Sequence, residues 1–449
     1  MKLFGTDGVR GKAGESPLDV PTIRRLGAAL VRAMRQGDAA SGTSGIKFLT
    51  GRDTRESGEW IERELAFGVR SQGGTLTSAG IIPTPAVAYL TPRLGYRAGV
   101  VISASHNPFE DNGIKVFSGA GEKFTETLEQ LVESIVADTS WSVTAGEPDR
   151  VEQIDLRSEY IGHLLEILPR DARQAGLRIA IDCANGATTT VAPRLFEELG
   201  FDVHLIGNRP DGRNINLKCG STAPDALSSL VVEGGYRLGI AFDGDGDRAI
   251  FIDANGAIVT GDAVMLMCAK HMKDEDRLPG HAIVATVMSN IGLELALKEA
   301  GIEMYRCPVG DKYVMEEMMR RGLALGGEQS GHIIFSEYLF TGDGLATALN
   351  VLRTMAGTRR ELADLASELT SYPQVLLNLR VGRKADLRTI PTVATVMDAV
   401  EARLAGHGRL LVRYSGTEPL LRVMLEGRDE TELRQWGQEI VDAARDALT

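Results

Sequence analysis

Three carboxylates stand at alternate positions in the segment Asp243-Gly-Asp-Gly-Asp-Arg, namely Asp243, Asp245 and Asp247. They directly follow the apolar segment 238–242, which reads as a buried strand. Carboxylates this close repel one another unless a cation lies between them, and oxygen ligands favour a hard ion, Mg²⁺ or Ca²⁺. An EF-hand calcium loop is excluded, because Arg248 stands where that loop requires Gly and Ala254 stands where it requires Glu. A solvated acidic turn is the alternative. We favour a metal site, with Mg²⁺ as the ion.

A serine-rich loop carries the second candidate chemistry. An apolar strand ends in Ser103-Ala-Ser-His-Asn-Pro, and Lys115 follows shortly afterwards. The hydroxyl of Ser105, among backbone amides and a lysine, could take and release a phosphoryl group. A polar turn whose side chains cap the backbone is the alternative. A serine hydrolase is disfavoured, because no Gly-x-Ser-x-Gly surrounds Ser105.

Two further loops carry groups that suit a sugar phosphate. In Gly326-Gly-Glu-Gln-Ser-Gly-His, Glu328 and Ser330 could bind sugar hydroxyls or an amine, and His332 could move a proton. This loop alone also reads as a plain turn. The later segment Arg413-Tyr-Ser-Gly-Thr suits a phosphate, because arginine binds phosphate bidentately and turn amides attract anions. An ordinary hairpin turn is its alternative. Its candidate ligands are Arg413, Ser415, Gly416 and Thr417.

One pattern of elements recurs three times and would position these loops. A buried strand, a polar loop, a helix and a second strand occur in order, and the helices end at Gly73, Gly200 and Gly301. Such units imply crossovers within mostly parallel sheets. The end of the chain differs, with strands expected at 375–381, 410–413 and 421–425 and an amphipathic helix at 429–448.

The predicted fold class is therefore α/β, with three similar mixed α/β domains and a C-terminal α+β domain. The predicted domains are 1–150 with the Ser105 loop, 151–252 with the acidic loop, 253–369 with the Glu328 loop, and 370–449 with the Arg413 loop.

Composition excludes several classes of partner. The chain of 449 residues has a net charge of −12 and no long basic run, so nucleic acid and anionic membranes are poor partners. No segment approaches the ~18 apolar residues of a membrane span. The four cysteines are widely spaced and the first residues lack an apolar leader, which predicts a cytoplasmic protein. We expect a small-molecule substrate and a monomer or homodimer.

Five segments together resemble the α-D-phosphohexomutase family along essentially the whole chain. They are Gly5-Thr-Asp-Gly-Val-Arg-Gly, Ser103-Ala-Ser-His-Asn-Pro, Asp243-Gly-Asp-Gly-Asp-Arg, Gly327-Glu-Gln-Ser-Gly-His and Arg413-Tyr-Ser-Gly-Thr-Glu-Pro. The resemblance implies four domains around a central active-site cleft. It also implies an isomerase that transfers a phosphoryl group within a hexose phosphate.

The same resemblance implies a role for each candidate residue. Ser105 would be the phosphorylated serine, and Asp243, Asp245 and Asp247 would hold Mg²⁺ with an oxygen of that phosphoserine. Glu328 and Ser330 would bind the sugar, and the Arg413 loop would bind the phosphate that is not reacting. The groups around the transferring phosphoryl group would be Arg10, Lys115, Arg248 and His332.

The implied reaction interconverts glucosamine 6-phosphate and glucosamine 1-phosphate through a glucosamine 1,6-bisphosphate, with a sugar 1,6-bisphosphate as activator. The product would serve UDP-N-acetylglucosamine and peptidoglycan precursor synthesis. Gln329 favours the amino sugar, because relatives that act on mannose or glucose phosphates more often carry Met there. The alternatives are a phosphomannomutase/phosphoglucomutase, a metal-dependent sugar phosphatase and a non-catalytic sugar-phosphate sensor.

Overall fold

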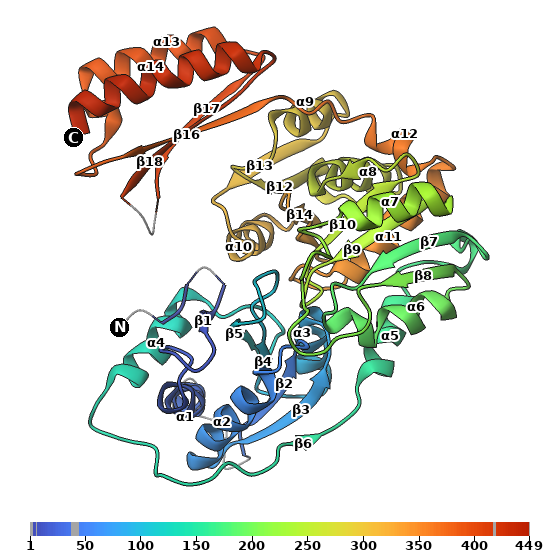
Figure 1. Cartoon of the computed structure of the whole chain (residues 1–449), viewed down its shortest axis with the longest axis vertical. Helices are drawn as coiled ribbons and strands as arrows, with labels where there is room; N and C mark the ends of the chain where they lie inside the picture. The colour runs from blue at the N-terminus through green and yellow to red at the C-terminus, as the bar shows by residue number, and fades with distance from the viewer. Residues whose placement is uncertain (1–2, 6, 37–44, 416–418, 449) are drawn as a thin grey trace. The chain divides into compact units, whose positions relative to one another are not determined.

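The computed structural model describes residues 3–5, 7–36, 45–415 and 419–448. The chain forms two compact units. The larger unit comprises residues 1–288 and 302–367, and the C-terminal unit comprises residues 289–301 and 368–449. Figure 1 labels the helices and strands of both units.

The first sheet of the larger unit has the strand order β1-β5-β4-β2-β3-β6. Its strands are β1 (Val9–Lys12), β2 (Lys47–Arg52), β3 (Thr75–Ile81), β4 (Ala98–Ile102), β5 (Asp111–Ser118) and β6 (Glu152–Gln153). The accompanying helices are α1 (Val20–Gln36), α2 (Gly58–Ser71), α3 (Thr84–Arg93) and α4 (Glu126–Ala137). Strand β2 is parallel to β3 and β4, whereas β5 is antiparallel to β4 and β1. The turn between β4 and β5 carries Ser105.

The second sheet has the order β11-β10-β9-β7-β8. Its strands are β7 (Arg178–Asp182), β8 (Asp202–Ile206), β9 (Leu238–Phe242), β10 (Ala249–Asp253) and β11 (Ile258–Val259). The helical segments are α5 (Arg157–Leu165), η1 (Arg170–Ala172), η2 (Ala187–Thr190), α6 (Ala192–Glu198) and α7 (Asp225–Gly234). The hairpin β9–β10 carries the three carboxylates, and both of its strands are buried throughout. The sheet extends to Val259, past the boundary that the sequence predicts at residue 252.

The third sheet has the order β13-β12-β14-β15. Its strands are β12 (Ala282–Thr286), β13 (Glu303–Cys307), β14 (Leu325–Gly327) and β15 (Ile333–Phe335). The helical segments are α8 (Gly261–Asp274), η3 (Pro279–His281), α10 (Asp311–Arg321), α11 (Gly344–Thr358) and α12 (Leu362–Ala366). The hairpin β14–β15 carries the Glu328 loop. Helix α9 (Ile291–Glu299), which follows β12 in the chain, is grouped with the C-terminal unit.

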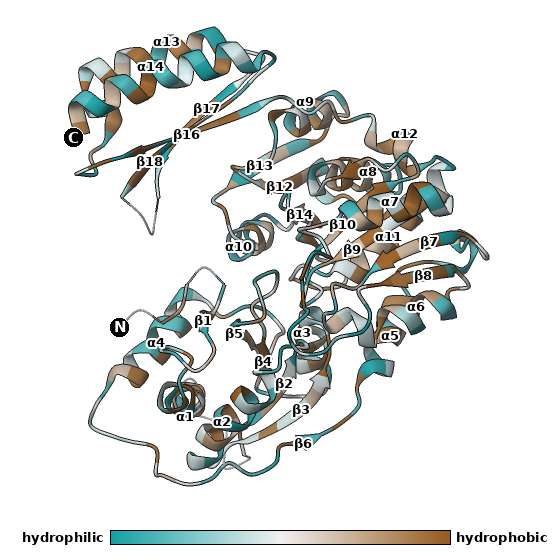
Figure 2. Cartoon of the chain, in the orientation of Figure 1, coloured by the Kyte–Doolittle hydropathy of each residue, from teal (hydrophilic) through white to brown (hydrophobic). Residues whose placement is uncertain are grey.

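The C-terminal unit contains an antiparallel sheet of order β16-β18-β17 with its own hydrophobic core. The strands of this sheet are β16 (Gln374–Arg380), β17 (Arg409–Tyr414) and β18 (Leu420–Glu426). The helical segments are η4 (Leu387–Thr389), α13 (Pro391–Leu404) and α14 (Glu430–Leu448). Helices α13 and α14 each carry hydrophobic and hydrophilic stretches (Figure 2), and their buried side chains, such as Val400 and Ile440, belong to this core.

The predicted fold class is confirmed: three mixed α/β sheets are followed by a C-terminal α+β part. The three helix-ending glycines have φ values of 72° at Gly73, 85° at Gly200 and 66° at Gly301, the left-handed conformation that glycine adopts readily. Helix α13 is absent from the elements that the sequence predicts. Among the described residues, no helix is long and apolar enough to cross a membrane.

Candidate active site

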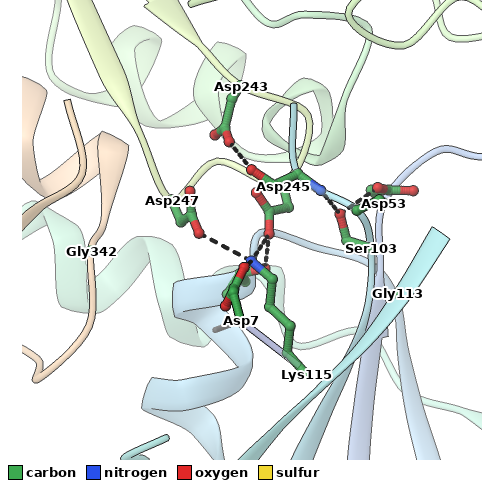
Figure 3. A network of polar contacts seen from close by, with 12 residues as sticks. Asp7, Asp53, Ser103, Gly113, Lys115, Asp243, Asp245, Asp247 and Gly342 are labelled. Atoms are coloured by element: carbon green, nitrogen blue, oxygen red, sulfur yellow. Dashed lines mark hydrogen bonds and ion pairs between the residues drawn. The ribbon is translucent and has the colours of Figure 1, made fainter. Parts of the chain in front are cut away.

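The turn after β4 holds Ser105 in an uncommon backbone conformation. Its φ is 53°, in the left-handed region, and the residue is buried. The Ser105 backbone N–H donates to Ser103 Oγ at 2.9 Å, and the Ser103 hydroxyl in turn donates to the buried carboxylate of Asp53 (Figure 3). The nucleophile candidate is therefore held by the turn that presents it.

Arg55, just beyond β2, binds the carbonyls of this turn with a completely buried side chain. Its Nη2 donates to Ser105 O and to Asn107 O, both at 2.9 Å, and its Nε donates to Asp53 Oδ2 at 2.8 Å. Asn216 Nδ2, in the loop between β8 and α7, also donates to Ser105 O at 2.9 Å. Donors from two segments that lie far apart in the sequence thus hold the carbonyls of Ser105 and Asn107.

The acidic hairpin meets Ser105 directly. Ser105 Oγ donates to Asp243 Oδ2 at 2.5 Å, so the hydroxyl and the first carboxylate of the triplet are in contact. The approach depends on Gly244, because a Cβ there would lie 2.5 Å from Ser105 O. The structure therefore places the predicted phosphoryl carrier against the predicted metal ligands.

The carboxylates fit a hard cation by two observations. One oxygen each of Asp243, Asp245 and Asp247 can be chosen so that all lie within 4.8 Å of one another. Asp245 Oδ1 and Asp247 Oδ1 are buried and accept no hydrogen bond from any described residue. Burial and the neighbouring carboxylates raise the pKa of Asp243 well above its ordinary value, a penalty that a bound cation would remove.

Lys115 on β5 supplies positive charge at the same point. Its Nζ lies 2.9 Å from Asp245 Oδ2, 3.2 Å from Asp247 Oδ2 and 3.1 Å from Asp7 Oδ2 (Figure 3). Burial alone would lower the pKa of Lys115, but these carboxylates outweigh it and raise the pKa well above its ordinary value. Lys115 is therefore a permanently charged ammonium group.

Two arginines lie at the edge of this cluster. Arg10 on β1 pairs with Asp7, and its Nη1 donates to Ala104 O at 3.4 Å. Arg248 lies between the acidic loop and β10, and its backbone N–H donates to Asp243 Oδ1 at 3.1 Å. Burial alone would lower the pKa of each guanidinium, but the surrounding carboxylates outweigh it and raise the pKa, so both stay charged. Both side chains keep some exposure and can face a phosphate.

His332 is buried between two acidic groups. Its Nδ1 lies 3.7 Å from Asp247 Oδ1, and its Nε2 accepts a hydrogen bond of 3.0 Å from the Gly342 backbone N–H. A backbone N–H can only donate, so Nε2 acts as the acceptor and the ring proton lies on Nδ1, facing Asp247. This tautomer orients His332 toward the metal ligand.

The predicted sugar loop abuts the acidic hairpin. Glu328 Oε1 accepts the Gly310 backbone N–H at 3.1 Å, while Ser330 is exposed. Gly331 has a φ of 89°, and a Cβ there would lie 2.3 Å from Ala249 O at the start of β10. Only glycine allows this approach, which brings the Glu328 loop beside the carboxylates.

The Arg413 loop belongs to the other unit. Arg413 lies on β17, opposite Arg422 of β18, and lines a cavity of about 470 Å³ within the C-terminal unit. Ser415 follows the strand, and its backbone N–H donates to Leu420 O at 2.8 Å. The predicted ligands Gly416 and Thr417 lie outside the described residues.

The larger unit thus gathers most of the predicted site residues, and it adds others that sequence reasoning missed. Arg55 and Asp311 are buried, Asp7 and Lys123 are partly exposed, and all four are connected to the cluster. Asp7 stands three residues before Arg10 in a glycine-flanked segment, a signal that could have indicated it. Nothing local distinguishes Arg55 from a surface arginine.

Four family models match successive parts of the chain. Models of the phosphoglucomutase/phosphomannomutase alpha/beta/alpha domains I, II and III match residues 1–142, 158–256 and 260–372. The model of the C-terminal domain of the same proteins matches residues 376–443.

Full-length relatives agree with these models. A protein of Solibacter usitatus named phosphoglucosamine mutase is 48% identical, over 99% of this chain and 98% of its own. One of Moorella thermoacetica with the same name is 46% identical, over 96% of each chain. A crystal structure of a phosphoglucomutase/phosphomannomutase family protein from Burkholderia thailandensis shares the fold, with a TM-score of 0.81 and 23% identity over 99% of this chain and 97% of that one. With relatives this similar over almost its entire length, the chain belongs to the α-D-phosphohexomutase family, a family of isomerases.

Proposed function

We propose that the protein interconverts glucosamine 6-phosphate and glucosamine 1-phosphate, with Ser105 carrying the phosphoryl group. The observation that supports this most is the 2.5 Å contact between Ser105 Oγ and Asp243 Oδ2 within a buried cluster of alternating charge. Relatives named phosphoglucosamine mutase, at 41% to 48% identity, support the choice of sugar.

In the first half of the reaction, phosphorylated Ser105 donates to the 1-hydroxyl of glucosamine 6-phosphate. The bond from phosphorus to Ser105 Oγ breaks, a bond to the sugar oxygen forms, and the hydroxyl proton leaves to a nearby base. Lys115 and Arg10 would bind the oxygens of the transferring group, over which negative charge spreads in a loose transition state.

The three carboxylates Asp243, Asp245 and Asp247 would hold Mg²⁺ together with an oxygen of the phosphoserine. When bound, this ion would offset the charge of the phosphoryl oxygens and raise the electrophilicity of phosphorus. Arg55 and Asn216 hold the turn that carries Ser105, and His332 faces Asp247.

In the second half, the bisphosphate reorients and returns its 6-phosphoryl group to Ser105, so that no phosphate is released. Glu328 and Ser330 would bind the sugar in both orientations. Arg413, Ser415, Gly416 and Thr417 would bind whichever phosphate is not reacting. A sugar 1,6-bisphosphate would serve as activator by phosphorylating Ser105, and the product would enter UDP-N-acetylglucosamine synthesis.

The test is phosphorus NMR of the purified protein with Mg²⁺, a trace of glucose 1,6-bisphosphate and one hexose 6-phosphate at a time. We expect glucosamine 6-phosphate to be converted about a hundredfold faster than the glucose or mannose compound, a barrier difference of ~2.7 kcal/mol. Faster turnover of glucose or mannose 6-phosphate would contradict the choice of sugar. Net release of inorganic phosphate would support a phosphatase instead.

Ser105→Ala tests the carrier in the same assay. The change removes the only atom that we propose to accept the phosphoryl group, so turnover should fall below detection. The matched control is Ser134→Ala, which removes an exposed hydroxyl of helix α4 that bonds only within its helix. Near-normal turnover of Ser105→Ala would remove the phosphoserine mechanism.

A further inference from the structure

We propose that Lys123 is a positioning residue for phosphoryl transfer: it joins Asp311 of the third sheet's domain to Asp7 and so keeps Asp7 in place against Lys115. This inference rests on the proposed function of the cluster around Ser105. It assigns a role to a chain of buried charges that lies beside the carboxylate triplet.

Lys123 links two segments that are far apart in the sequence. Its Nζ lies 2.6 Å from Asp7 Oδ1 and contacts Asp311 Oδ2. Only 10% of its side chain is exposed, and Asp311 is exposed to the same small extent. Burying a lysine ammonium costs free energy unless opposite charges compensate it. Here two carboxylates do so, and they fix the position of Lys123 Nζ between them.

Asp7 divides its two oxygens between different cations. Oδ1 binds Lys123, whereas Oδ2 lies 3.1 Å from Lys115 Nζ and also pairs with Arg10. Burial raises the pKa of Asp7, but Lys115, Lys123 and Arg10 outweigh it and hold the pKa well below its ordinary value. Asp7 is therefore an ionised carboxylate shared by three cations.

The arrangement matters because of what Lys115 would otherwise contact. Its other two partners, Asp245 and Asp247, belong to the triplet that fits a metal ion. A metal ion bound to the triplet would compete with Lys115 for the charge of Asp245 and Asp247. Asp7 would then be the carboxylate that holds the Lys115 ammonium in position. The location of Asp7 consequently sets where Lys115 meets a phosphoryl group.

The other end of the chain of charges reaches the sugar loop. Asp311 is the first residue of α10, and the preceding residue, Gly310, donates its N–H to Glu328 Oε1 at 3.1 Å. Lys123 thus connects the residue next to the sugar-binding candidate with the cation next to the phosphoryl carrier. Its loss should misplace Lys115 while leaving the sugar contacts in place.

The decisive variant is Lys123→Met, which keeps the length of the side chain and removes its charge. We expect kcat to fall roughly tenfold to a hundredfold, as for a catalytic group misplaced by about 1 Å, with KM changed less than about threefold. A large rise in KM at unchanged kcat would overturn the proposal.

Lys312→Met is the matched control. Lys312 Nζ lies 2.7 Å from Glu129 Oε2, with 12% of its side chain exposed, and so forms another buried pair between α10 and α4 outside the chain of charges. If Lys123 acts through Asp7, Lys312→Met should keep wild-type kcat. An equal loss in both variants would show that Lys123 only joins packed elements, and would overturn the proposal.

A double-mutant cycle with Asp7→Asn separates positioning from independent effects. Because Lys123 is proposed to act through Asp7, the double variant should be no slower than Asp7→Asn alone. A double variant slowed by the product of the two single factors would contradict the inference. If Lys123→Met does not fold, Asp311→Asn weakens the same link and enters the cycle in its place.

A second readout makes the result independent of the sugar. Phosphorylation of Ser105 by glucose 1,6-bisphosphate is followed by intact mass in a single turnover, and it should slow in Lys123→Met but not in Lys312→Met. If the wild type converts glucose phosphates rather than glucosamine phosphates, the proposed substrate fails while this comparison still decides the role of Lys123. Equal single-turnover rates in wild type and Lys123→Met would overturn it.

Discussion

At the scale of single residues, the site is a buried array in which carboxylates and cations alternate. Asp7 lies against Lys115, Lys115 against Asp245 and Asp247, and Ser105 against Asp243. In a low-dielectric interior such charges are tolerable only when paired, and pairing also fixes their geometry. The site is therefore pre-organised to bind a cation and an anionic group together.

The carboxylate triplet gives a prediction about metal binding. Without a cation, burial and repulsion disfavour the ionised form of Asp243, so Asp243→Asn should raise the melting temperature of the metal-free protein. In the wild type, added Mg²⁺ should raise the melting temperature, because it binds only the folded state. The variant should lose most of this response and its turnover. The measurement is thermal unfolding with EDTA and with a series of Mg²⁺ concentrations.

Asp253→Asn serves as the control, since Asp253 lies in the same sheet and caps the β10–β11 turn through Asn255 and Ala257. It should keep the response to Mg²⁺. Full turnover of the wild type after exhaustive chelation, or an unchanged response in Asp243→Asn, would count against the metal site.

At the scale of elements, much of the fold and of the site could be predicted from the sequence. The Ser105, Asp243 and Glu328 loops each join two strands, and apolar strands with glycine-ended helices are local patterns. Chemistry-bearing residues in such loops gather where the strands of a sheet end. Local sequence therefore indicated Ser105, the carboxylates and Lys115 together.

Long-range pairing could not be predicted in the same way. Arg55 is an arginine in a polar stretch, and only the fold shows that it is completely buried with its donors on the carbonyls around Ser105. Lys123 and Asp311 are 188 positions apart and meet only in the folded chain, where the loop after β5 contacts the start of α10. No periodicity or spacing within one segment encodes such a contact.

Helix α11 gives a prediction about pH. Asp343 caps this helix by accepting the Ala346 N–H at 2.9 Å, and it also accepts the Tyr160 hydroxyl at 2.7 Å. Burial raises the pKa of Asp343 to about 6. The folded protein then holds a proton that the unfolded chain releases near pH 4, so this group makes stability fall as pH rises from about 4 to about 6, by at most ~3 kcal/mol, and has no further effect above that.

Asp343→Asn can still accept the Ala346 N–H with its amide oxygen, while its amide N–H donates to the Tyr160 oxygen, and the change should remove this contribution. The free energy of unfolding in urea, measured between pH 4 and pH 7, should fall less steeply with pH in the variant than in the wild type. The exposed Asp364→Asn on α12 is the control and should follow the wild type. Identical pH profiles for Asp343→Asn and wild type would contradict the prediction.

At the scale of the whole molecule, the chain is acidic, but it gathers cations at the site. The net charge is −12, yet Arg10, Lys115 and Arg248 gather around Ser105. Salt screens charges beyond ~8 Å under physiological conditions, so this local cluster governs the attraction of a sugar phosphate. The C-terminal unit has a separate core, and within it Arg413 is a candidate for phosphate binding.

Arg413→Ala tests whether the C-terminal unit binds the phosphate of the substrate. Loss of a charged hydrogen-bonding group should raise KM by roughly tenfold or more, at about 1.5–3 kcal/mol for such a bond. Phosphorylation of Ser105 at saturating bisphosphate should change much less. Arg434→Ala, which removes an exposed side chain paired with Glu430 on α14, should leave both unchanged. Steady-state kinetics and intact mass give the two readouts, and an unaltered KM in Arg413→Ala would argue against the phosphate role.

The left-handed backbone at Ser105 has a consequence for how such a sequence changes over generations. Glycine adopts a φ of 53° without strain and asparagine with little, whereas serine bears a cost of about 1 kcal/mol. Selection for stability alone would therefore favour glycine or asparagine at this position. A copy that is no longer selected for activity, but still for folding, would lose its phosphoryl carrier and be relieved of this backbone cost. Folded, inactive descendants with Gly or Asn at position 105 are the expected form of decay.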